Sequence, residues 1–185
     1  RAPTYYVPGN HDVHAGGLGR YRSVFGKDYY TFRVKNVTFV AIDSQLLGNF
    51  DDFKARRPPP VPPAVEAESR QMLSWMEEES AKLAKRQAQE HARGGASAAA
   101  REIVVGMQHV PLARNGDFPE PFRAYWVINE PYRSRELSML RKLGIRHMFA
   151  GHWHKSMVFE ADGITWHIAP STSRVPTRRW INSSS

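Results

Sequence analysis

Short apolar runs separated by polar turns predict alternating strands and helices along the chain. Strand-like runs rich in β-branched and aromatic residues occur at residues 4–7, 29–35, 37–42, 102–108, 145–150, 156–160 and 164–168. Apolar residues at helical spacing predict helices at residues 18–25, 65–92 and 130–143. Asn36 and Asp162-Gly163 each separate two strand-like runs, which indicates two β-hairpins. The alternation in the middle of the chain, with hairpins at both ends, predicts a mixed α/β layer architecture.

The predicted helix at residues 65–92 is the longest one. Its apolar side chains recur on one face, at Met72, Trp75, Met76 and Leu83. Such a stripe is typical of a helix that packs on a core. We therefore interpret it as a packing face rather than a cofactor-binding surface.

Two segments interrupt this pattern within what we interpret as one domain, residues 1–185. Residues 48–63 include the run Arg-Arg-Pro-Pro-Pro-Val-Pro-Pro, whose prolines cannot build regular hydrogen-bonded structure. We interpret this segment as a proline-rich insertion loop, with a ligand for a proline-recognising domain as the alternative. Residues 94–100 contain only glycine, alanine and serine, which predicts a flexible linker.

The composition is that of a globular domain and does not indicate a function. The 185 residues are 41% hydrophobic and 24% charged, which is ordinary for a globular domain. No apolar run approaches the length of a membrane span, so we expect no membrane partner. The chain has no cysteine, which excludes disulfides, thiolate metal ligands and a cysteine nucleophile, and fits a cytoplasmic location.

The formal net charge of +8 is compatible with an anionic partner such as phosphate, nucleic acid or a membrane surface, and equally with a solvated basic surface. The chain has no basic run with interleaved aromatic residues of the kind that single-strand binders use, which argues against a nucleic-acid partner. The sequence gives no indication of the oligomeric state.

Polar side chains that can bind metal follow three of the predicted strands. They are Asn10, His11 and Asp12 after the first strand, His109 after the strand at 102–108, and His152 and His154 after the strand at 145–150. Loops at one end of a sheet are where α/β folds place their chemistry. In extended backbone His152 and His154 would point to the same side, so we expect both rings to face one pocket.

These side chains can bind divalent metal ions. Asparagine and histidine suit borderline divalent ions such as Mn, Fe or Zn, whereas the scarcity of carboxylates argues against Ca or Mg. Two such ions can clamp the attacking and leaving oxygens of a phosphoryl transfer. A histidine beside an aspartate is also a natural general acid, because the carboxylate favours the imidazolium form.

Three motifs, in this order, resemble those of the calcineurin-like metallophosphoesterase superfamily: Gly9-Asn10-His11-Asp12, His109-Val110-Pro111 and Gly151-His152-Trp153-His154. The similarity runs in pieces from about residue 5 to about residue 169 and includes Asp43-Ser44-Gln45. The resemblance implies an α/β fold, a metallophosphoesterase-type β-sandwich flanked by helices, with two metal ions at one edge.

The resemblance also implies a role for each site residue. The expected ligands of one divalent ion (Mn, Fe or Zn) are Asn10, His109 and His152, and the ligand of the second ion is His154. His11 would be the general acid that protonates the leaving alkoxide, oriented by Asp12, and a metal-bound hydroxide would be the nucleophile. The expected reaction is hydrolysis of phosphomonoesters, extending to phosphoserine and phosphothreonine in proteins.

The chain departs from the family pattern at its start. The family's first two motifs, Asp-x-His and Gly-Asp, normally precede Gly-Asn-His-Asp and supply further ligands, but neither is found before Gly9. The Gly-Asp pair at Gly116-Asp117 lies in the wrong place. We therefore expect a fragment that lacks the N-terminal strands of the fold. It would hold at most a partial, single-metal site and would leave an unpaired sheet edge.

Two alternative functions stay open. A phosphodiesterase or nuclease of the same superfamily would use the same metal chemistry. A catalytically inactive, protein-binding scaffold would keep the fold and use the proline-rich insertion as its docking segment. The histidines His11, His109, His152 and His154 argue against the scaffold, because a scaffold need not keep all four.

Overall fold

The predicted strands assemble into one six-stranded sheet in the order β1-β2-β3-β4-β6-β5. The computed structural model describes residues 3–13, 17–92, 102–112 and 124–171. The strands are β1 (Tyr30–Val34), β2 (Val37–Ala41), β3 (Ile103–Met107), β4 (His147–Ala150), β5 (Met157–Ala161) and β6 (Ile164–Ile168). The helices are α1 (Asn10–Val13), α2 (Gly17–Phe25), α3 (Pro63–Ala92) and α4 (Tyr132–Lys142), with 3-10 turns η1 (Ser44–Leu47) and η3 (Ala124–Trp126).

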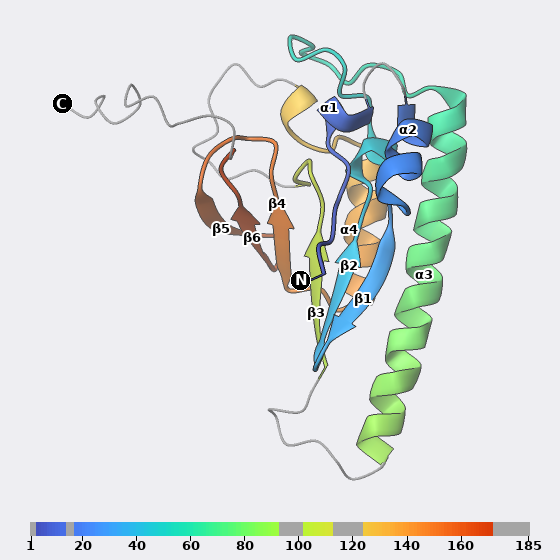
Figure 1. Cartoon of the computed structure of the whole chain (residues 1–185). Helices are drawn as coiled ribbons and strands as arrows, with labels where there is room; N and C mark the ends of the chain where they lie inside the picture. Colours follow the sequence, from blue (N-terminus) through green and yellow to red (C-terminus); the bar gives the residue numbers. More distant parts are fainter. Residues whose placement is uncertain (1–2, 14–16, 93–101, 113–123, 172–185) are drawn as a thin grey trace, which may run out of the picture.

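Four neighbouring strands, β2, β3, β4 and β6, run parallel to one another. Each edge strand is antiparallel to its neighbour, β1 to β2 and β5 to β6. Both predicted hairpins are confirmed. Lys35 adopts left-handed backbone (φ 57°) between β1 and β2, and Asp162 (φ 57°) with Gly163 (φ 77°) forms the two-residue turn between β5 and β6. Because the central strands are parallel, the loops after their carboxyl ends share one edge of the sheet (Figure 1).

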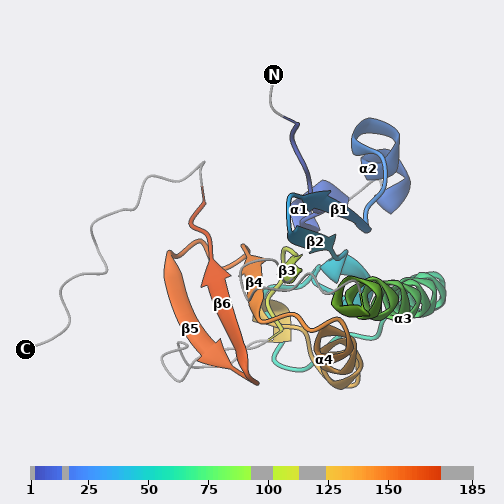
Figure 2. The same ribbon diagram turned by 90° about the horizontal axis from the view of Figure 1, so that it is seen from below.

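Helices α3 and α4 lie side by side on one face of the sheet (Figure 2). Met72, Met76 and Leu83 of α3 are at most 3% exposed, so the predicted packing face is confirmed. Leu140 of α4 and Met148 of β4 have no exposed surface. The core therefore lies between the sheet and this pair of helices, below the edge that carries the loops.

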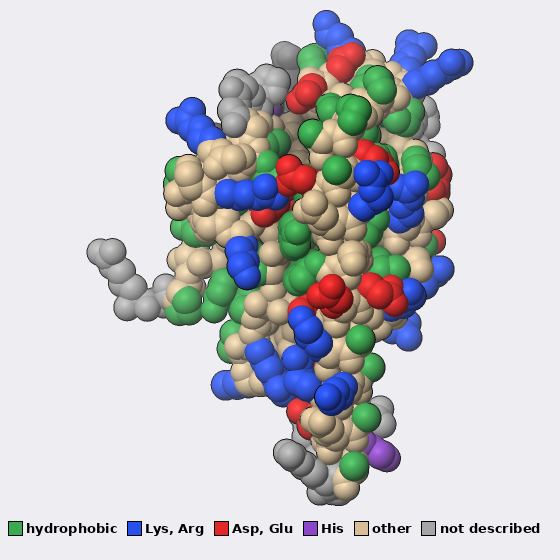
Figure 3. Space-filling view, turned by 90° about the vertical axis from the view of Figure 1, so that its right-hand side faces the viewer, with side chains coloured by type: hydrophobic (Ala, Val, Ile, Leu, Met, Phe, Trp, Pro, Cys, Tyr) green, Lys and Arg blue, Asp and Glu red, His purple; other side chains and the backbone are tan. Residues whose placement is uncertain are grey.

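The outer surface of α3 shows how part of the net charge of +8 is distributed. Acidic and basic side chains are intermixed over the upper part of this face, and several Lys and Arg side chains gather toward its lower part (Figure 3). Lys142 pairs with Glu77 at 2.5 Å on this surface, and Arg86 pairs at 2.7 Å with Glu102, whose side chain is buried. Among the described helices, none is both long and apolar enough to cross a membrane.

Residues 4–7 do not form the strand that the sequence predicted. Both backbone groups of Tyr6 bond instead to the Tyr30 hydroxyl, which accepts from the Tyr6 N–H at 2.9 Å and donates to the Tyr6 carbonyl at 2.8 Å. The Tyr5 ring stacks on Phe32. The backbone of Tyr6 therefore bonds to a side-chain hydroxyl and not to the backbone of a neighbouring strand.

The α/β architecture with flanking helices that the resemblance implied is confirmed. The described residues form one sheet, so a second sheet of the implied β-sandwich is not found among them. Residues 48–62 contain no helix or strand, and α3 begins at Pro63. The expected linker at 94–100 and the pair Gly116-Asp117 lie outside the described residues.

Candidate metal centre

Three candidate ligands meet at the carboxyl edge of the sheet. His109 follows β3, His152 follows β4, and Asn10 is the first residue of α1. The loops after β3 and β4 are joined because the Gly151 N–H donates to the His109 carbonyl at 3.0 Å. Asn10 is 8% exposed and His152 is 4% exposed, so both side chains are withdrawn from water.

The polar atoms of these three side chains converge. His109 Nε2 lies 3.0 Å from Asn10 Oδ1 and 3.3 Å from His152 Nδ1. Two imidazole nitrogens bound tetrahedrally to one ion at about 2.0–2.1 Å would lie about 3.3–3.4 Å apart, because the tetrahedral angle fixes that edge. The separation of the two histidines therefore matches that of two ligands of one metal ion.

Two glycines make room for the His109 ring. A Cβ at Gly9 would lie 3.1 Å from two atoms of the ring, closer than ordinary van der Waals contact, and a Cβ at Gly151 would lie 3.4 Å from its Nδ1. The ring is thus packed against backbone that carries no side chain. This contact explains in steric terms why glycine stands at position 9 and at position 151.

Both clustered histidines are held in the neutral form. Burial lowers the pKa of His109 to about 4. Burial and the neighbouring His109 lower the pKa of His152 to about 3. Neutral imidazole offers a lone pair and is the form that binds metal.

Hydrogen bonding identifies which nitrogen offers the lone pair. His152 Nε2 lies 2.8 Å from the Tyr125 carbonyl oxygen, which can only accept, so Nε2 carries the hydrogen and Nδ1 carries the lone pair. His109 Nε2 faces two acceptors, Asn10 Oδ1 and His152 Nδ1, so in this arrangement it donates to them. If His109 carried its hydrogen on Nδ1 instead, lone pairs of Asn10 Oδ1, His109 Nε2 and His152 Nδ1 would all be directed toward one metal position.

This donor set of one oxygen and two nitrogens fits a borderline divalent ion. The described residues contain no group of three or more histidine, aspartate or glutamate side chains placed to hold a metal ion. A site formed by the residues that the structure describes therefore depends on the amide oxygen of Asn10.

The predicted second-metal ligand, His154, does not share the burial of His152. Both residues have left-handed backbone (φ 67° for His152 and 55° for His154), and His154 is exposed. The prediction that the two rings lie on one side of an extended segment is wrong, because neither residue is extended. Left-handed backbone costs a non-glycine residue roughly 1–2 kcal/mol, and strain of this kind clusters at functional sites.

His11 and Asp12 lie in α1 at the rim of the cluster. His11 is exposed, and its charge acts on the pKa of both buried histidines. The Asp12 carboxylate accepts the Gly9 N–H at 2.9 Å, while the Gly9 carbonyl accepts the Asp12 N–H at 3.0 Å. No hydrogen bond between Asp12 and the His11 ring is found within the described residues, so Asp12 holds the turn that presents His11.

Arg22 of α2 is bound by two carboxylates. It donates twice to Asp28 at 2.8 Å and once to Glu68 at 2.6 Å. Asp43 lies behind this group with no exposed surface, and its pKa is raised well above its ordinary value by burial and by Asp28. This network was not evident from the sequence, because its members come from α2, α3 and two loops.

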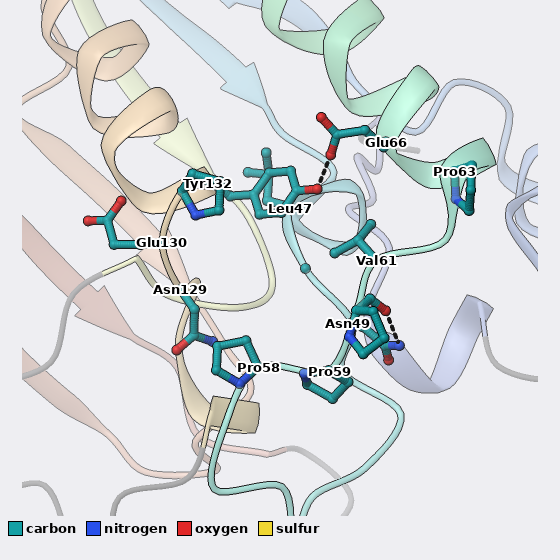
Figure 4. Close-up of a pocket in the computed structure, with 13 residues that line it drawn as sticks. Leu47, Asn49, Pro58, Pro59, Val61, Pro63, Glu66, Asn129, Glu130 and Tyr132 are labelled. Atoms are coloured by element: carbon teal, nitrogen blue, oxygen red, sulfur yellow. Dashed lines mark hydrogen bonds between the residues drawn. The ribbon is translucent and has the colours of Figure 1, made fainter.

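A cleft of about 490 Å³ opens between the proline-rich segment and the start of α4 (Figure 4). Its lining includes Pro58, Pro59, Val61, Asn129 and Tyr132. The Tyr132 hydroxyl donates to Glu66 at its rim. Phe50 connects the cleft to the metal-ligand cluster, because its ring packs against Gly48 in the cleft wall and meets the His152 ring edge-on at 6.3 Å.

Comparisons with known proteins give the same family as the motifs. The model of the calcineurin-like phosphoesterase family matches residues 1–156. The chain is similar to the serine/threonine-protein phosphatase CPPED1 of Mus musculus, with 25% identity over 158 residues. That alignment covers 83% of this chain and 42% of the relative, so the chain spans about two fifths of the relative's length.

The chain has a more distant likeness to one solved structure, GAP50, the anchor in the inner membrane complex of Plasmodium. This likeness has a TM-score of 0.44 and 14% sequence identity, and it covers 80% of this chain and 38% of that one. A likeness at this TM-score carries no argument about function.

Proposed function

We propose, on the premise that this chain belongs to the calcineurin-like phosphoesterase family, that it takes part in metal-dependent hydrolysis of phosphate esters. The observation that carries the proposal is the convergence of Asn10 Oδ1, His109 Nε2 and His152 Nδ1, with separations of 3.0 and 3.3 Å about His109 Nε2. All three donors are neutral, so a Mn, Fe or Zn ion held there would keep its full charge for polarising a phosphate group and activating water.

His11 is the proposed general acid. It projects from α1 directly after Asn10 and is exposed, so a phosphate ester at the cluster could reach its ring. An imidazolium at this position would donate a proton to the leaving alkoxide, a contribution of about 10²–10⁴-fold to the rate. Asp12 would support it through the turn, by holding the Gly9 N–H.

His154 is the proposed ligand of a second metal ion. Its exposed position and its electrostatic effect on the pKa of His152 support a place beside the first ion rather than at it. We propose phosphomonoesters as substrates, with phosphoserine and phosphothreonine in proteins as the class. The support for this class is the name of the similar CPPED1, a serine/threonine-protein phosphatase.

The first experiment measures bound metal per chain by elemental analysis, after incubation with Mn²⁺ and dialysis. We expect metal on the chain, its loss in His109→Ala, and its retention in His91→Ala, which alters an exposed histidine of α3. Turnover is then measured with an aryl phosphomonoester and an aryl phosphodiester, on a longer chain that also carries the family's Asp-x-His and Gly-Asp motifs. Preference for the diester would favour a phosphodiesterase, and absence of both metal and turnover would favour a protein-binding scaffold.

A further inference from the structure

Tyr125, in η3, contacts two of the candidate ligands at once. Its hydroxyl accepts a hydrogen bond from Asn10 Nδ2 at 2.8 Å, although 115 residues separate the two. Its backbone carbonyl accepts from His152 Nε2 at 2.8 Å. The Tyr125 ring also lies 4.5 Å from the His152 ring, measured between centroids.

The contact with Asn10 bears on which end of the amide faces His109. Only the oxygen of an asparagine amide can bind a cation, whereas its NH₂ group can only donate hydrogen bonds. The NH₂ group donates to the phenol oxygen of Tyr125, and Oδ1, at the other end of the amide, lies 3.0 Å from His109 Nε2. Because Asn10 is 8% exposed, water offers the NH₂ group little alternative.

The contact with His152 sets the tautomer of that ring. Further hydrogen bonds fix the position of η3. Consecutive carbonyls of η3 accept from consecutive residues after β4, since the Trp126 carbonyl accepts from Trp153 Nε1 at 2.7 Å. At its other end, the Ala124 N–H donates to the Ala55 carbonyl at 3.0 Å. The proline-rich segment therefore helps to fix η3 against the cluster.

We infer that Tyr125 is a positioning residue whose hydroxyl turns the Asn10 oxygen toward the metal ion that His109 and His152 would also bind. The inference rests on the proposed function, because it concerns the same three ligands. Outer-sphere partners of this kind hold ligands in the geometry that the ion requires, and their loss typically weakens metal affinity by about 10–100-fold.

The test compares the affinity for Zn²⁺ of the 185-residue chain and of Tyr125→Phe, by competition with a chromophoric chelator. The substitution keeps the ring and the backbone carbonyl and removes only the hydroxyl that Asn10 uses. We expect affinity to fall about 10–100-fold, with little change in the melting temperature without metal. The matched control is Tyr132→Phe, which removes a hydroxyl bonded to Glu66 away from the ligands and should leave Zn²⁺ affinity unchanged.

A double-mutant cycle tests whether Tyr125 acts through Asn10. Asn10→Ala alone should weaken Zn²⁺ binding, and adding Tyr125→Phe should then change affinity less than about twofold, because the coupled pair is already broken. A residue with a merely structural role would weaken binding in both backgrounds by the same factor.

The outcomes separate this inference from the proposed function. If the chain binds Zn²⁺ and Tyr125→Phe binds it equally well, the role of Tyr125 is wrong and the metal centre stands. Additive losses in the cycle would also overturn the inference. If the unaltered chain binds neither Zn²⁺ nor Mn²⁺, the metal centre itself is wrong and Tyr125 has no ligand to position.

Discussion

His109 and His152, which are 43 residues apart in the chain, face each other with Nε2 of the first 3.3 Å from Nδ1 of the second. The parallel pairing of β3 with β4 brings their loops together, and the Gly151 N–H bonded to the His109 carbonyl fixes their spacing. The two rings can approach because burial keeps both neutral.

Gly9→Ala should disturb the metal-ligand cluster without unfolding the chain. The new methyl group would lie 3.1 Å from the His109 ring, which would have to shift by a few tenths of an ångström. We expect metal affinity to fall at least about tenfold and the free energy of unfolding to fall by about 1–3 kcal/mol, the usual cost of overpacking. Calorimetric titration with Zn²⁺ and urea denaturation would measure the two effects.

The matched control for this change is Gly19→Ala in α2, where a Cβ meets nothing within 4 Å. Alanine is favoured over glycine inside a helix by about 0.5–1 kcal/mol, so this variant should be slightly more stable and should bind metal normally. Equal metal affinity in both variants would show that the contact of Gly9 with His109 has no bearing on the cluster.

As pH falls, the metal-free chain should unfold at a higher pH than a variant that lacks the buried histidines. Unfolded histidines take up protons near pH 6.5, whereas the folded pKa values are about 4 for His109 and about 3 for His152. Between pH 6.5 and about 4 the unfolded state binds more protons, so the free energy of unfolding falls as pH falls. The slope is at most about 1.4 kcal/mol per pH unit for each histidine.

Urea denaturation at several pH values from 7 to 5 would measure this slope. The variant His152→Gln should show a shallower slope, while His91→Ala on the exposed end of α3 should match the unaltered chain. Identical slopes in all three would mean that the clustered histidines stay accessible to protons in the folded state.

Glu136 should impose the opposite pH dependence. This residue of α4 has no exposed surface, and burial raises its pKa from 4.5 to about 8, with partial compensation by Gln108. A raised folded pKa contributes stability below pH 4.5 that is lost as pH rises toward 8. Glu136→Gln should therefore gain on the order of 1 kcal/mol per pH unit over the unaltered chain across this range. Thermal unfolding at pH 5 and pH 8 would show whether the gap widens.

His11→Ala should separate catalysis from metal binding. His11 is exposed in α1, and the three converging donors come from other residues. In a longer chain that also carries the family's Asp-x-His and Gly-Asp motifs, we expect turnover of an aryl phosphomonoester to fall at least about 100-fold, within the range for general acid catalysis, while bound metal is unchanged. His147→Ala, at an exposed position in β4, should leave both quantities unaltered. Wild-type turnover in His11→Ala would remove this residue from the mechanism.

Local sequence patterns determined most of the secondary structure and the location of the candidate site. The stripe of α3 and the turn at Asp162-Gly163 depend on spacing between near neighbours, which a sequence displays directly. The placement of Asn10, His109 and His152 after strand-like runs was also visible. Parallel strands then carry such residues to one edge of a sheet, so their meeting could be anticipated.

Only the tertiary structure decided which atoms face one another. Residues 4–7 form no strand, and the backbone groups of Tyr6 bond instead to the Tyr30 hydroxyl, a contact between residues far apart in the chain. The backbone at His152 and His154 turns left-handed, which buries one ring and exposes the other. Tyr125 lies between Asn10 and His152 although no motif marks it. Burial, tautomer and amide orientation arise from contacts between residues far apart in the chain, and no short-range pattern encodes them.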